Sequence, residues 1–261
     1  MDTNSEWLKY FEQNAKEILP VNHDEYRLTD EEWSRIEKSI QAFEIGEASE
    51  GKCLKQKAAE YALKAGEPLY PEIMKYFIRE ENRHSAYLSK FMHLHGIAKK
   101  KSNWTDGVFR FLRNLFNLEV SIRVLVAAEL IAIFYYRALG EATGSSLLKT
   151  ICARMLAEER EHVKFQMLTI HKINLPKHPI AAALSDMLHG LLVCATIGVV
   201  WHEHKAVLAR AYSFGSFYSA VYDAFRECMD DGRERAFRAL IAERFAEARR
   251  SSVYSSAGAG S

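Results

Sequence analysis

The sequence predicts an all-α protein, a four-helix bundle with additional C-terminal helices. Apolar residues recur at helical spacing over long segments, and short runs that contain glycine or proline separate these segments. No sustained alternation of apolar and polar residues is flanked by hairpin turns, so strands are not expected. The 261 residues are enough to bury a sizeable core. We therefore expect residues 1–261 to form a single domain.

Four long helices are expected in the bundle, which takes up about residues 29–173. Thr29 and Glu32 form a capping box at the start of the first helix, and Pro71 suits the first turn of the second. The breakers "LKAGEPLYP", "AKKKSN" and "GEATGSS" separate the four segments. The predicted helices are residues 29–65, 71–95, 105–139 and 145–172.

Accessory helices are expected over about residues 178–250. A mostly apolar helix should span residues 179–212 and a shorter one residues 217–229, followed by an amphipathic helix through "RAFRALIAERFAEARR". The apolar run "GLLVCATIGVVW" is shorter than the roughly 20 residues of a membrane span, so we expect a buried helix and no membrane contact. Residues 251–261 are expected to be a disordered tail.

Composition and charge exclude several classes of function. The net charge of +1 and the interspersed acids and bases leave no basic stripe, so nucleic acid is not an expected partner. The four cysteines are far apart, which excludes a CxxC metal site and a disulfide framework. No secretory signal begins the chain, and we expect a cytoplasmic protein. No flavin or nicotinamide fingerprint is present.

Two near copies of one motif predict a metal site. "REENRHSAYL" and "AEEREHVKFQ" each place a glutamate three residues before a histidine. Residues three apart on a helix project from one face, so Glu81 with His84 can direct a carboxylate and an imidazole to one point. Glu159 with His162 can do the same. A single such pair is more often a solvated surface pair, but two copies in matching helices favour a shared site.

The other two helices are each expected to add one carboxylate. Bundles that hold two metal ions take one glutamate from each of two helices and a Glu-x-x-His pair from each of the others. Glu129 lies in the centre of an apolar stripe, where an isolated carboxylate would be costly to ionise. On the first helix, Glu47 faces the same way as the apolar residues, whereas Glu44 lies to one side and is the second choice.

The six residues fall into two matching halves, each a single glutamate followed by a Glu-x-x-His pair. Four ionised carboxylates would neutralise two divalent cations, and mixed oxygen and imidazole ligands suit iron or manganese better than zinc. We therefore expect two iron ions (Fe2+/Fe3+), with a mixed Mn/Fe pair as the alternative. The predicted metal-binding and catalytic residues are Glu47, Glu81, His84, Glu129, Glu159 and His162.

This arrangement resembles the ferritin-like di-iron carboxylate superfamily. Locally, "EENRHSAYLSKFMHLHG" and "AEEREH" resemble two metal-binding helices of soluble acyl-carrier-protein desaturases. The resemblance implies a ferritin-like bundle in which Glu81 and Glu159 bridge the irons. It also implies that the preceding acids, Glu80 and Glu158, each orient the histidine of the opposite helix. A homodimer is a further expectation from the family.

The sequence departs from the desaturase pattern beside the site. Desaturases and many hydroxylases carry a threonine about one turn after the third-helix glutamate, whereas Ala132 and Ile133 stand here. The resemblance therefore implies the wider class, an O2-activating non-haem di-iron oxygenase or oxidase of hydroxylase or desaturase type. Such a monooxygenase-like oxidoreductase would act on a small hydrophobic substrate and receive electrons from an external reductase or ferredoxin.

Three alternatives stay open. One is iron oxidation or peroxide scavenging as in ferritins and rubrerythrins, although the extra helices and the lack of a CxxC pair count against it. A regulatory helical protein with a relict site and a quinol oxidase bound to the membrane surface are the others. Small residues near the ligands, Gly46 and Ala128 among them, can leave room for a substrate or allow close helix contact.

The sequence leaves the substrate, the reaction type and the oligomeric state undetermined. Asp186 and His189 repeat the acid and histidine spacing on the apolar fifth helix, and His202 follows them. No partner helix is evident for these three residues, so ordinary polar roles are favoured. Tyr136, about two helical turns beyond Glu129, is expected to pack in the core, with a role in electron transfer as the alternative.

Overall fold

The protein is all-α, as the sequence predicts. The computed structural model describes residues 1–48, 51–103, 107–108, 111 and 117–257, and the side chains of these residues up to 241. Within these ranges it contains helices and no strand. The helices are α1 (Asn4–Asn14), α2 (Asp30–Glu47), α3 (Lys52–Ala65), α4 (Tyr70–Leu94), α6 (Leu118–Glu141), α7 (Ser146–Asn174), α8 (Pro179–Leu208) and α9 (Phe214–Ala257).

Local capping signals set most helix starts. Thr29 forms the predicted capping box with Glu32 at the start of α2, and Pro71 lies in the first turn of α4. Ser145 caps α7 by accepting a hydrogen bond from the backbone of Leu148. The expected ends of the second and fourth helices agree with the observed ends of α4 and α7 to within two residues.

The first predicted helix, residues 29–65, is wrong as a single rod. It is divided into α2 and α3, and Gly51 precedes α3 with φ +63°, in the left-handed region that an α-helix cannot use. A Cβ at this position would lie 2.6 Å from Cδ1 of Ile78, so a side chain here would require Ile78 of α4 to move. The positive φ and this contact both favour glycine.

The third predicted helix, residues 105–139, is not continuous either: residues 107–108 and 111 are helical, but residue 117 is not. Asn117 has extended backbone angles and its side chain accepts a hydrogen bond from the backbone of Val120, so α6 starts at Leu118. The expected start near Thr105 lies outside the described residues. A short helix that was not predicted, α1, begins with a capping box between Thr3 and Glu6.

At the C-terminus, the two predicted helices after residue 212 form one continuous helix, α9. Gly232 lies at the expected interruption, where a Cβ would be 2.8 Å from Cδ2 of His171. A glycine inside a helix can therefore serve close packing against a neighbour rather than end the helix. The expected disordered tail is helical through Ala257, and residues 258–261 lie outside the described residues.

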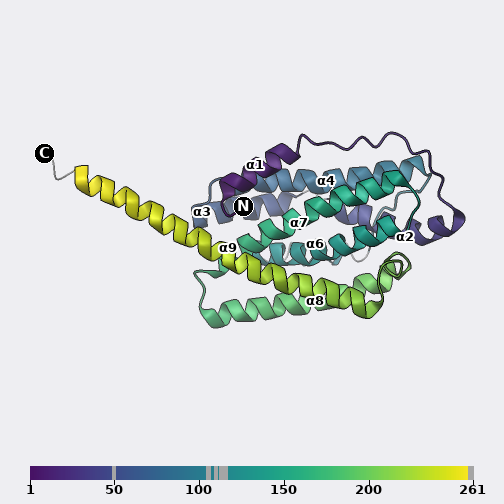
Figure 1. The fold of residues 1–261 in the computed structure, drawn as a ribbon. Helices are drawn as coiled ribbons and strands as arrows, with labels where there is room; N and C mark the ends of the chain where they lie inside the picture. The colour runs from purple at the N-terminus through teal and green to yellow at the C-terminus, as the bar shows by residue number, and fades with distance from the viewer. Residues whose placement is uncertain (49–50, 104–106, 109–110, 112–116, 258–261) are drawn as a thin grey trace.

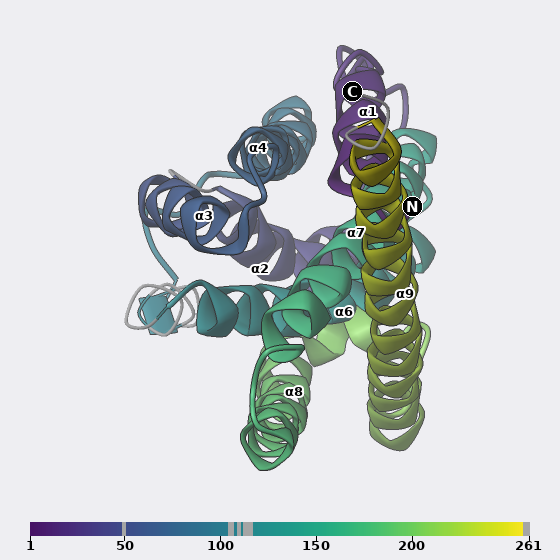
Figure 2. The same ribbon diagram turned by 90° about the vertical axis from the view of Figure 1, so that its left-hand side faces the viewer.

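Helices α2, α4, α6 and α7 run lengthwise beside one another, with the strongest packing between α6 and α7 and between α2 and α4 (Figure 1). An end view places α3 and α4 on one side and α8 below α6 (Figure 2). Helix α9 crosses α7, α6 and α8, and its C-terminal part extends well beyond the other helices (Figure 1). The accessory helices thus cover the face formed by α6 and α7.

Helix α8 is less buried than expected. It is long and apolar enough to cross a membrane, and only 22% of its most apolar window is buried. One stripe, which includes Val193, Ile197 and Val200, faces α6, whereas Leu184, Leu191 and other large apolar residues are exposed. The run of residues 190–201, which was expected to be buried, is therefore buried on one face only. Apolar composition indicates that a helix can be buried. The fraction of the helix that is buried depends on how many other helices pack against it.

Candidate metal centre

Both Glu-x-x-His pairs are buried where α4 and α7 face each other. His84 and His162 have no exposed surface, and Glu81 and Glu159 are buried beside them. The pairs lie near the middle of their helices, and each side chain points inward because residues three apart share one helix face. The spacing identified in the sequence therefore brings both pairs together at one place in the core.

The single glutamates of α2 and α6 complete two groups that can hold a metal ion. The ligand atoms within each group lie within 4.8 Å of one another. Glu81 and Glu159 belong to both groups, so each of these carboxylates could contribute to either ion site. The first group is Glu47, Glu81, His84 and Glu159, and the second is Glu81, Glu129, Glu159 and His162.

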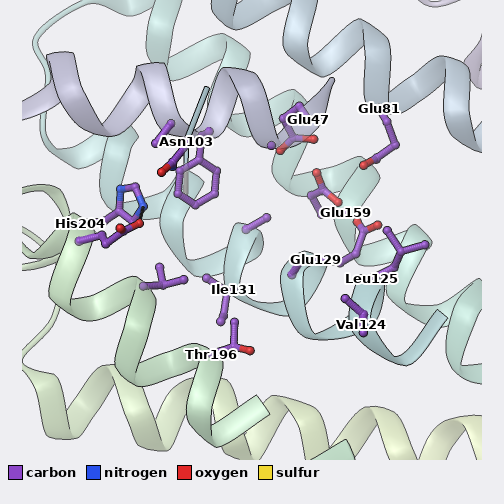
Figure 3. A pocket seen from close by; sticks show the side chains of 17 residues that line it. Glu47, Glu81, Asn103, Val124, Leu125, Glu129, Ile131, Glu159, Thr196 and His204 are labelled. Carbon is purple, nitrogen blue, oxygen red and sulfur yellow. Dashed lines mark ion pairs between the residues drawn. The ribbon is translucent and has the colours of Figure 1, made fainter. Parts of the chain in front are cut away.

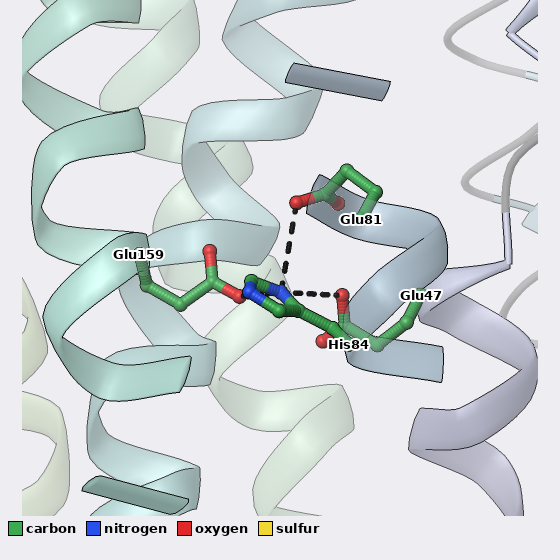
Figure 4. A group of neighbouring side chains, drawn as sticks. All are labelled: Glu47, Glu81, His84 and Glu159. Carbon is green, nitrogen blue, oxygen red and sulfur yellow. Dashed lines mark ion pairs between the residues drawn. The ribbon is translucent and has the colours of Figure 1, made fainter. Parts of the chain in front are cut away.

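The two imidazoles present the same nitrogen to the carboxylates. His84 Nδ1 lies 3.1 Å from Glu159 Oε1 and 3.6 Å from Glu47 Oε2. Figure 4 shows His84 between these residues and Glu81. His162 Nδ1 lies 3.2 Å from an oxygen of each of Glu81, Glu129 and Glu159. Both groups thus contain three carboxylates and one inward nitrogen.

The other nitrogen of each imidazole contacts an acid of the opposite helix. His84 Nε2 is 2.7 Å from Glu158 Oε2, and His162 Nε2 is 2.9 Å from Glu80 Oε2. A carboxylate at this position accepts the N–H, leaves the inward nitrogen free to bind a cation, and fixes the plane of the ring. These contacts are the ones that the family resemblance implies for Glu80 and Glu158.

Glu80 and Glu158 are in turn contacted by an outer layer of two arginines and one asparagine. Asn14 donates to Glu80 and, at 2.7 Å, to Glu158. Arg83 and Arg154 form ion pairs with Glu158 at 2.6 and 2.7 Å. Burial alone would raise the pKa of Glu158, but the hydrogen bond from His84 and the two arginines lower it to about 2. Glu158 is therefore ionised throughout the neutral range.

Sequence reasoning missed Asn14, because helix α1 was not predicted. The capping box at Thr3 and Glu6 was the signal that could have found the helix. Gln166, one turn after His162, was also missed; its Nε2 donates to Glu129 Oε1 at 3.2 Å. No sequence pattern marks Asn14 or Gln166, because each contacts glutamates that are distant in the chain.

The inner carboxyl groups are strongly perturbed. Burial, followed by the nearby charge of Glu159, raises the pKa of Glu129 to about 8. Burial likewise raises the pKa values of Glu47 and Glu81. For His84, burial acts to lower the pKa, but its carboxylate neighbours hold it well above the usual range. Without a bound metal cation, the inner glutamates and His84 therefore keep protons to higher pH than the same groups would with ordinary pKa values.

A metal cation fits this cluster. His84 Nδ1 and Glu81 Oε1 are buried and form no well-aligned hydrogen bond, although each lies within 3.2 Å of another ligand atom of the cluster; such an arrangement is costly unless something else binds the two atoms. Among the described residues, the ion pairs of the four inner glutamates are to the two histidines and not to lysine or arginine. A cation at the first group would replace the protons and satisfy both atoms, and a cation at the second group would satisfy Glu81.

Glu44 and Tyr136 are also placed by the structure. Glu44 Oε1 accepts from Lys99 at 2.8 Å and belongs to neither ligand group. Tyr136 is fully buried, and its hydroxyl donates to Glu47 Oε1. The sequence preference for Glu47 over Glu44 thus matches their positions, and Tyr136 holds one of the inner carboxylates.

Asp186 and His189 lie in a separate, partly buried network, called here the α8 cluster. His202 is exposed and takes no part in it. Arg123 of α6 forms an ion pair with Asp186 at 2.8 Å and donates to His189 Nδ1 at 3.2 Å. The cluster consists of Glu119, Arg123, Asn174, Lys177, Asp186 and His189.

A cavity of about 140 Å³ opens beside the inner carboxylates. Its walls come from α2, α6 and α8, and the small residues Gly46 and Ala128 are among its lining residues. Figure 3 shows four glutamates of the cluster at one end of the cavity and Asn103 and His204 at the other. A small molecule in this cavity would lie directly against the ligand groups.

The fold and the site define an all-helical protein with a buried carboxylate and histidine cluster that can hold metal ions. No protein-family model matches the chain, and no curated protein or solved structure shows significant similarity to it.

Proposed function

We propose that the protein is an O2-activating di-iron oxidoreductase of the ferritin-like class, which oxidises a small hydrophobic substrate. The observation that supports this most is the pair of ligand groups that share Glu81 and Glu159. The two groups would hold two ions with these carboxylates in common, and a pair of ions would supply the chemistry that activates O2. Iron is preferred because four carboxylates and two imidazoles suit it, with a mixed manganese and iron pair as the alternative.

The residues of this chain perform three tasks in the proposed reaction. The six inner side chains hold the ions, which when bound supply the reduction of O2 and the oxidation of the substrate. Glu80 and Glu158 keep both imidazoles oriented through their Nε2 atoms. The apolar walls of the cavity, such as Leu125 and Ile131, exclude water from the reacting groups.

Electrons come from a separate reductase or ferredoxin in this proposal. The cavity favours an organic substrate over the ferritin-like or rubrerythrin-like alternative, because iron oxidation or peroxide removal needs no apolar space beside the ions. Hydroxylation and desaturation are both compatible with the site. The reaction is proposed to take place in the cytoplasm.

Anaerobic titration of metal-free protein with Fe(II) tests the assignment. Two irons per chain are expected for the wild type and none with high affinity for the Glu81→Ala, Glu159→Ala double variant, because both ligand groups lose their shared residues. Glu47→Ala and Glu44→Ala form a matched pair on α2. Only Glu47→Ala should weaken iron binding, since Glu44 pairs with Lys99.

Exposure of the iron-loaded protein to O2 then distinguishes the alternatives. If small hydrophobic compounds accelerate the consumption of O2, or are themselves converted to an oxidised product, the oxygenase assignment is supported. Consumption of O2 or peroxide that depends only on added iron supports iron oxidation or peroxide removal. Failure of the wild type to bind stoichiometric iron would refute the di-iron assignment.

A further inference from the structure

Helix α8 has an apolar outer face that the other described helices leave in contact with solvent. Both ribbon views place α8 at the edge of the molecule, against α6 and α9 (Figures 1 and 2). On the outer side of α8, the large side chains that are 52–73% exposed are Ile180, Leu184, Met187, Leu188 and Leu191. A monomeric soluble protein seldom exposes a large apolar surface of this kind to water.

These residues belong to one straight stripe along the helix, called here the outer stripe. At 100° per residue, its members lie within about 60° of the direction of Leu191. The outer stripe consists of Ile180, Leu184, Met187, Leu188, Leu191, Ala195 and Gly198, all of them exposed. The one charged residue of the sequence between positions 180 and 201 is Asp186, which pairs with Arg123 on the inner side. The outer stripe is therefore apolar over a length of about 27 Å.

Two aromatic side chains of α9 widen this apolar surface. The ring of Phe214 lies 5.6 Å from that of Trp201 on α8, and both Phe214 and Tyr218 are exposed. The Tyr218 hydroxyl lies 3.2 Å from Cys194 Sγ. With roughly 100 Å² exposed on each large side chain, the stripe and these two rings present on the order of 700 Å². A standard protein–protein interface buries about 800 Å² of each partner, so this surface is large enough for a specific interface.

Large and small residues occupy opposite halves of the outer stripe. The N-terminal half carries the bulky Ile180 and Leu184, and the C-terminal half ends in Ala195 and Gly198. An antiparallel pair of α8 helices centred near residue 189 places Ile180 against the partner's Gly198, and Leu184 then faces the partner's Ala195. Because a two-fold axis repeats each contact, both ends of the pair are filled in the same way. A Cβ at Gly198 would meet nothing within 4 Å in its own chain, so this space is open to a partner.

The charges near the outer stripe favour a second copy of the chain over a membrane surface. Helices that lie on membranes are rich in lysine and arginine beside their apolar face. The sequence has no lysine or arginine between Lys177 and Lys205. A stripe without basic neighbours, with bulky residues in one half and small residues in the other, is complementary to itself.

We propose that two copies of the protein associate through the outer stripe of α8, as an antiparallel helix pair with its two-fold axis near residue 189. The family resemblance implies a homodimer without indicating which surfaces meet, whereas the face, the orientation and the register follow from α8. The inner side of the same helix lines the cavity through Thr196 and Val200, so the pairing also supports one wall of the cavity. The proposal does not depend on metal binding.

The mass of the full chain, measured by analytical ultracentrifugation over a concentration series, tests the association. The wild type should form a dimer. Leu191→Glu should raise the dissociation constant of the dimer by about a hundredfold or more, because each copy would bury a carboxylate without a counter-charge near the axis. Leu63→Glu is the matched control. Leu63 is 88% exposed on α3, away from the outer stripe, and its replacement should leave the mass unchanged.

Gly198→Trp distinguishes a shape-matched pair from a surface that is only adhesive. The new side chain has open space in its own chain, so the monomer should fold normally, as circular dichroism will show. The indole adds apolar surface but fills the space that the partner's Ile180 would occupy. The proposal therefore expects a dimer weakened by about tenfold or more, as overpacking typically costs. An adhesive surface would instead associate more tightly.

Cysteine variants test the register of the pair. In a background with Cys53→Ser and Cys194→Ser, Leu188→Cys lies beside the two-fold axis and should form a disulfide between copies under mild oxidation. Ala181→Cys is the control. Its two copies would be about 24 Å apart along the pair, too far for a disulfide. Cross-linking of Ala181→Cys without cross-linking of Leu188→Cys would refute the antiparallel register.

The proposal fails if the wild type stays monomeric up to about 100 µM, if Leu191→Glu stays dimeric, or if Gly198→Trp associates more tightly. Co-sedimentation with vesicles of phosphatidylcholine and phosphatidylglycerol tests the membrane alternative, and the wild type should remain in the supernatant. Vesicle binding by a monomeric wild type that Leu191→Glu abolishes would show that lipid covers the stripe, and would overturn the proposal. Because no measurement uses iron or O2, these results stand whether or not the di-iron assignment does.

Discussion

The metal centre and the α8 cluster use the same spacing of an acid and a histidine, but their surroundings differ in charge. In the metal centre, each Glu-x-x-His pair meets further carboxylates, and no arginine or lysine pairs with the inner glutamates among the described residues. In the α8 cluster, Asp186 and His189 meet Arg123, whose guanidinium also pairs with Glu119. Among the described residues, the inner glutamates of the metal centre therefore have no lysine or arginine partner, whereas the α8 cluster contains Arg123 and Lys177.

The histidine pKa values express this difference. Carboxylate neighbours hold the pKa of His162 well above its usual range despite burial, whereas burial and the charge of Arg123 lower that of His189 to about 3. A cation bound near His162 would relieve excess negative charge, while one near His189 would be repelled by Arg123. The spacing therefore places an acid and a histidine side by side. Whether such a pair can bind a metal depends on the next residue that it contacts, a carboxylate in the metal centre and an arginine in the α8 cluster.

Removal of Arg123 should have the largest effect on stability. Arg123→Met removes the guanidinium that pairs with the partly buried Asp186 and leaves Glu119 with Lys177 alone, which should lower the free energy of unfolding by about 2–3 kcal/mol. Urea denaturation measures this loss. The iron stoichiometry should stay at the wild-type value, because Arg123 contacts no residue of the ligand groups.

Arg137→Met is the control for this variant. Arg137 forms an exposed pair with Glu141 one turn away, and its loss should cost less than about 1 kcal/mol. If both variants are equally stable, the α8 cluster does not depend on its internal cation, and the contrast with the metal centre fails.

Removal of the charge on Glu158 should weaken metal binding. In Glu158→Gln the acceptor for His84 Nε2 is no longer anionic, and loss of such an orienting acid typically reduces metal affinity by about 10–100-fold. Competition titration with a chelator measures the change. Glu161→Gln alters a partly exposed acid of the same helix that pairs with Lys164 and should leave the affinity unchanged. Equal effects of the two variants would contradict the role of Glu158.

The two clusters should respond to pH in opposite directions. In the metal-free protein, Glu129 has a pKa of about 8 against an ordinary 4.5, so the folded state retains a proton that the unfolded chain has lost. Stability therefore falls as pH rises from about 4.5 to 8. The raised pKa values of His84 and His162 act in the same direction above pH 6.5. The depressed pKa of His189 acts oppositely, and only below pH 6.5.

Between pH 6.5 and 8, the metal-free protein should thus lose stability, as thermal denaturation will show. Mn(II) affinity should rise over the same range, by at most about tenfold per pH unit for each proton released. Glu129→Gln should flatten the decline in stability because the titrating group is absent. A metal-free protein whose stability rises between pH 6.5 and 8 would show that the inner carboxyl groups are not protonated.

The smallest effect is expected at Tyr136. Tyr136→Phe removes the hydrogen bond to Glu47 and should reduce metal affinity by a few-fold, since one such bond contributes about 1 kcal/mol. Tyr135→Phe changes a neighbouring tyrosine that bonds Ser39 instead, and it should not alter the affinity. Loss of all metal binding in Tyr136→Phe would indicate that the tyrosine does more than position Glu47.

The Glu-x-x-His repeat could be recognised from the sequence because it is local. Helical periodicity and capping residues predicted the all-α class and several helix ends, and three-residue spacing places Glu81 and His84 on one face wherever that helix lies. The direction of a side chain around its helix is also a local property, so Glu47, which faces the same way as the apolar residues, could be preferred to Glu44. Breaks were harder to predict: Gly51 interrupts a helix through its positive φ and its contact with Ile78, and Gly232 interrupts none.

Tertiary structure decided what each local pattern contacts. The approach of α4 to α7 aligned Glu158 with His84, α1 added Asn14 to the outer layer, and the position of α8 placed Arg123 beside His189. These are contacts between residues distant in the chain, and no periodicity encodes them. The sequence by itself determined helices that carry acids and histidines on defined faces. Packing determined which faces met one another and which met an arginine, because a buried charge depends on all of its neighbours and not on its own helix alone.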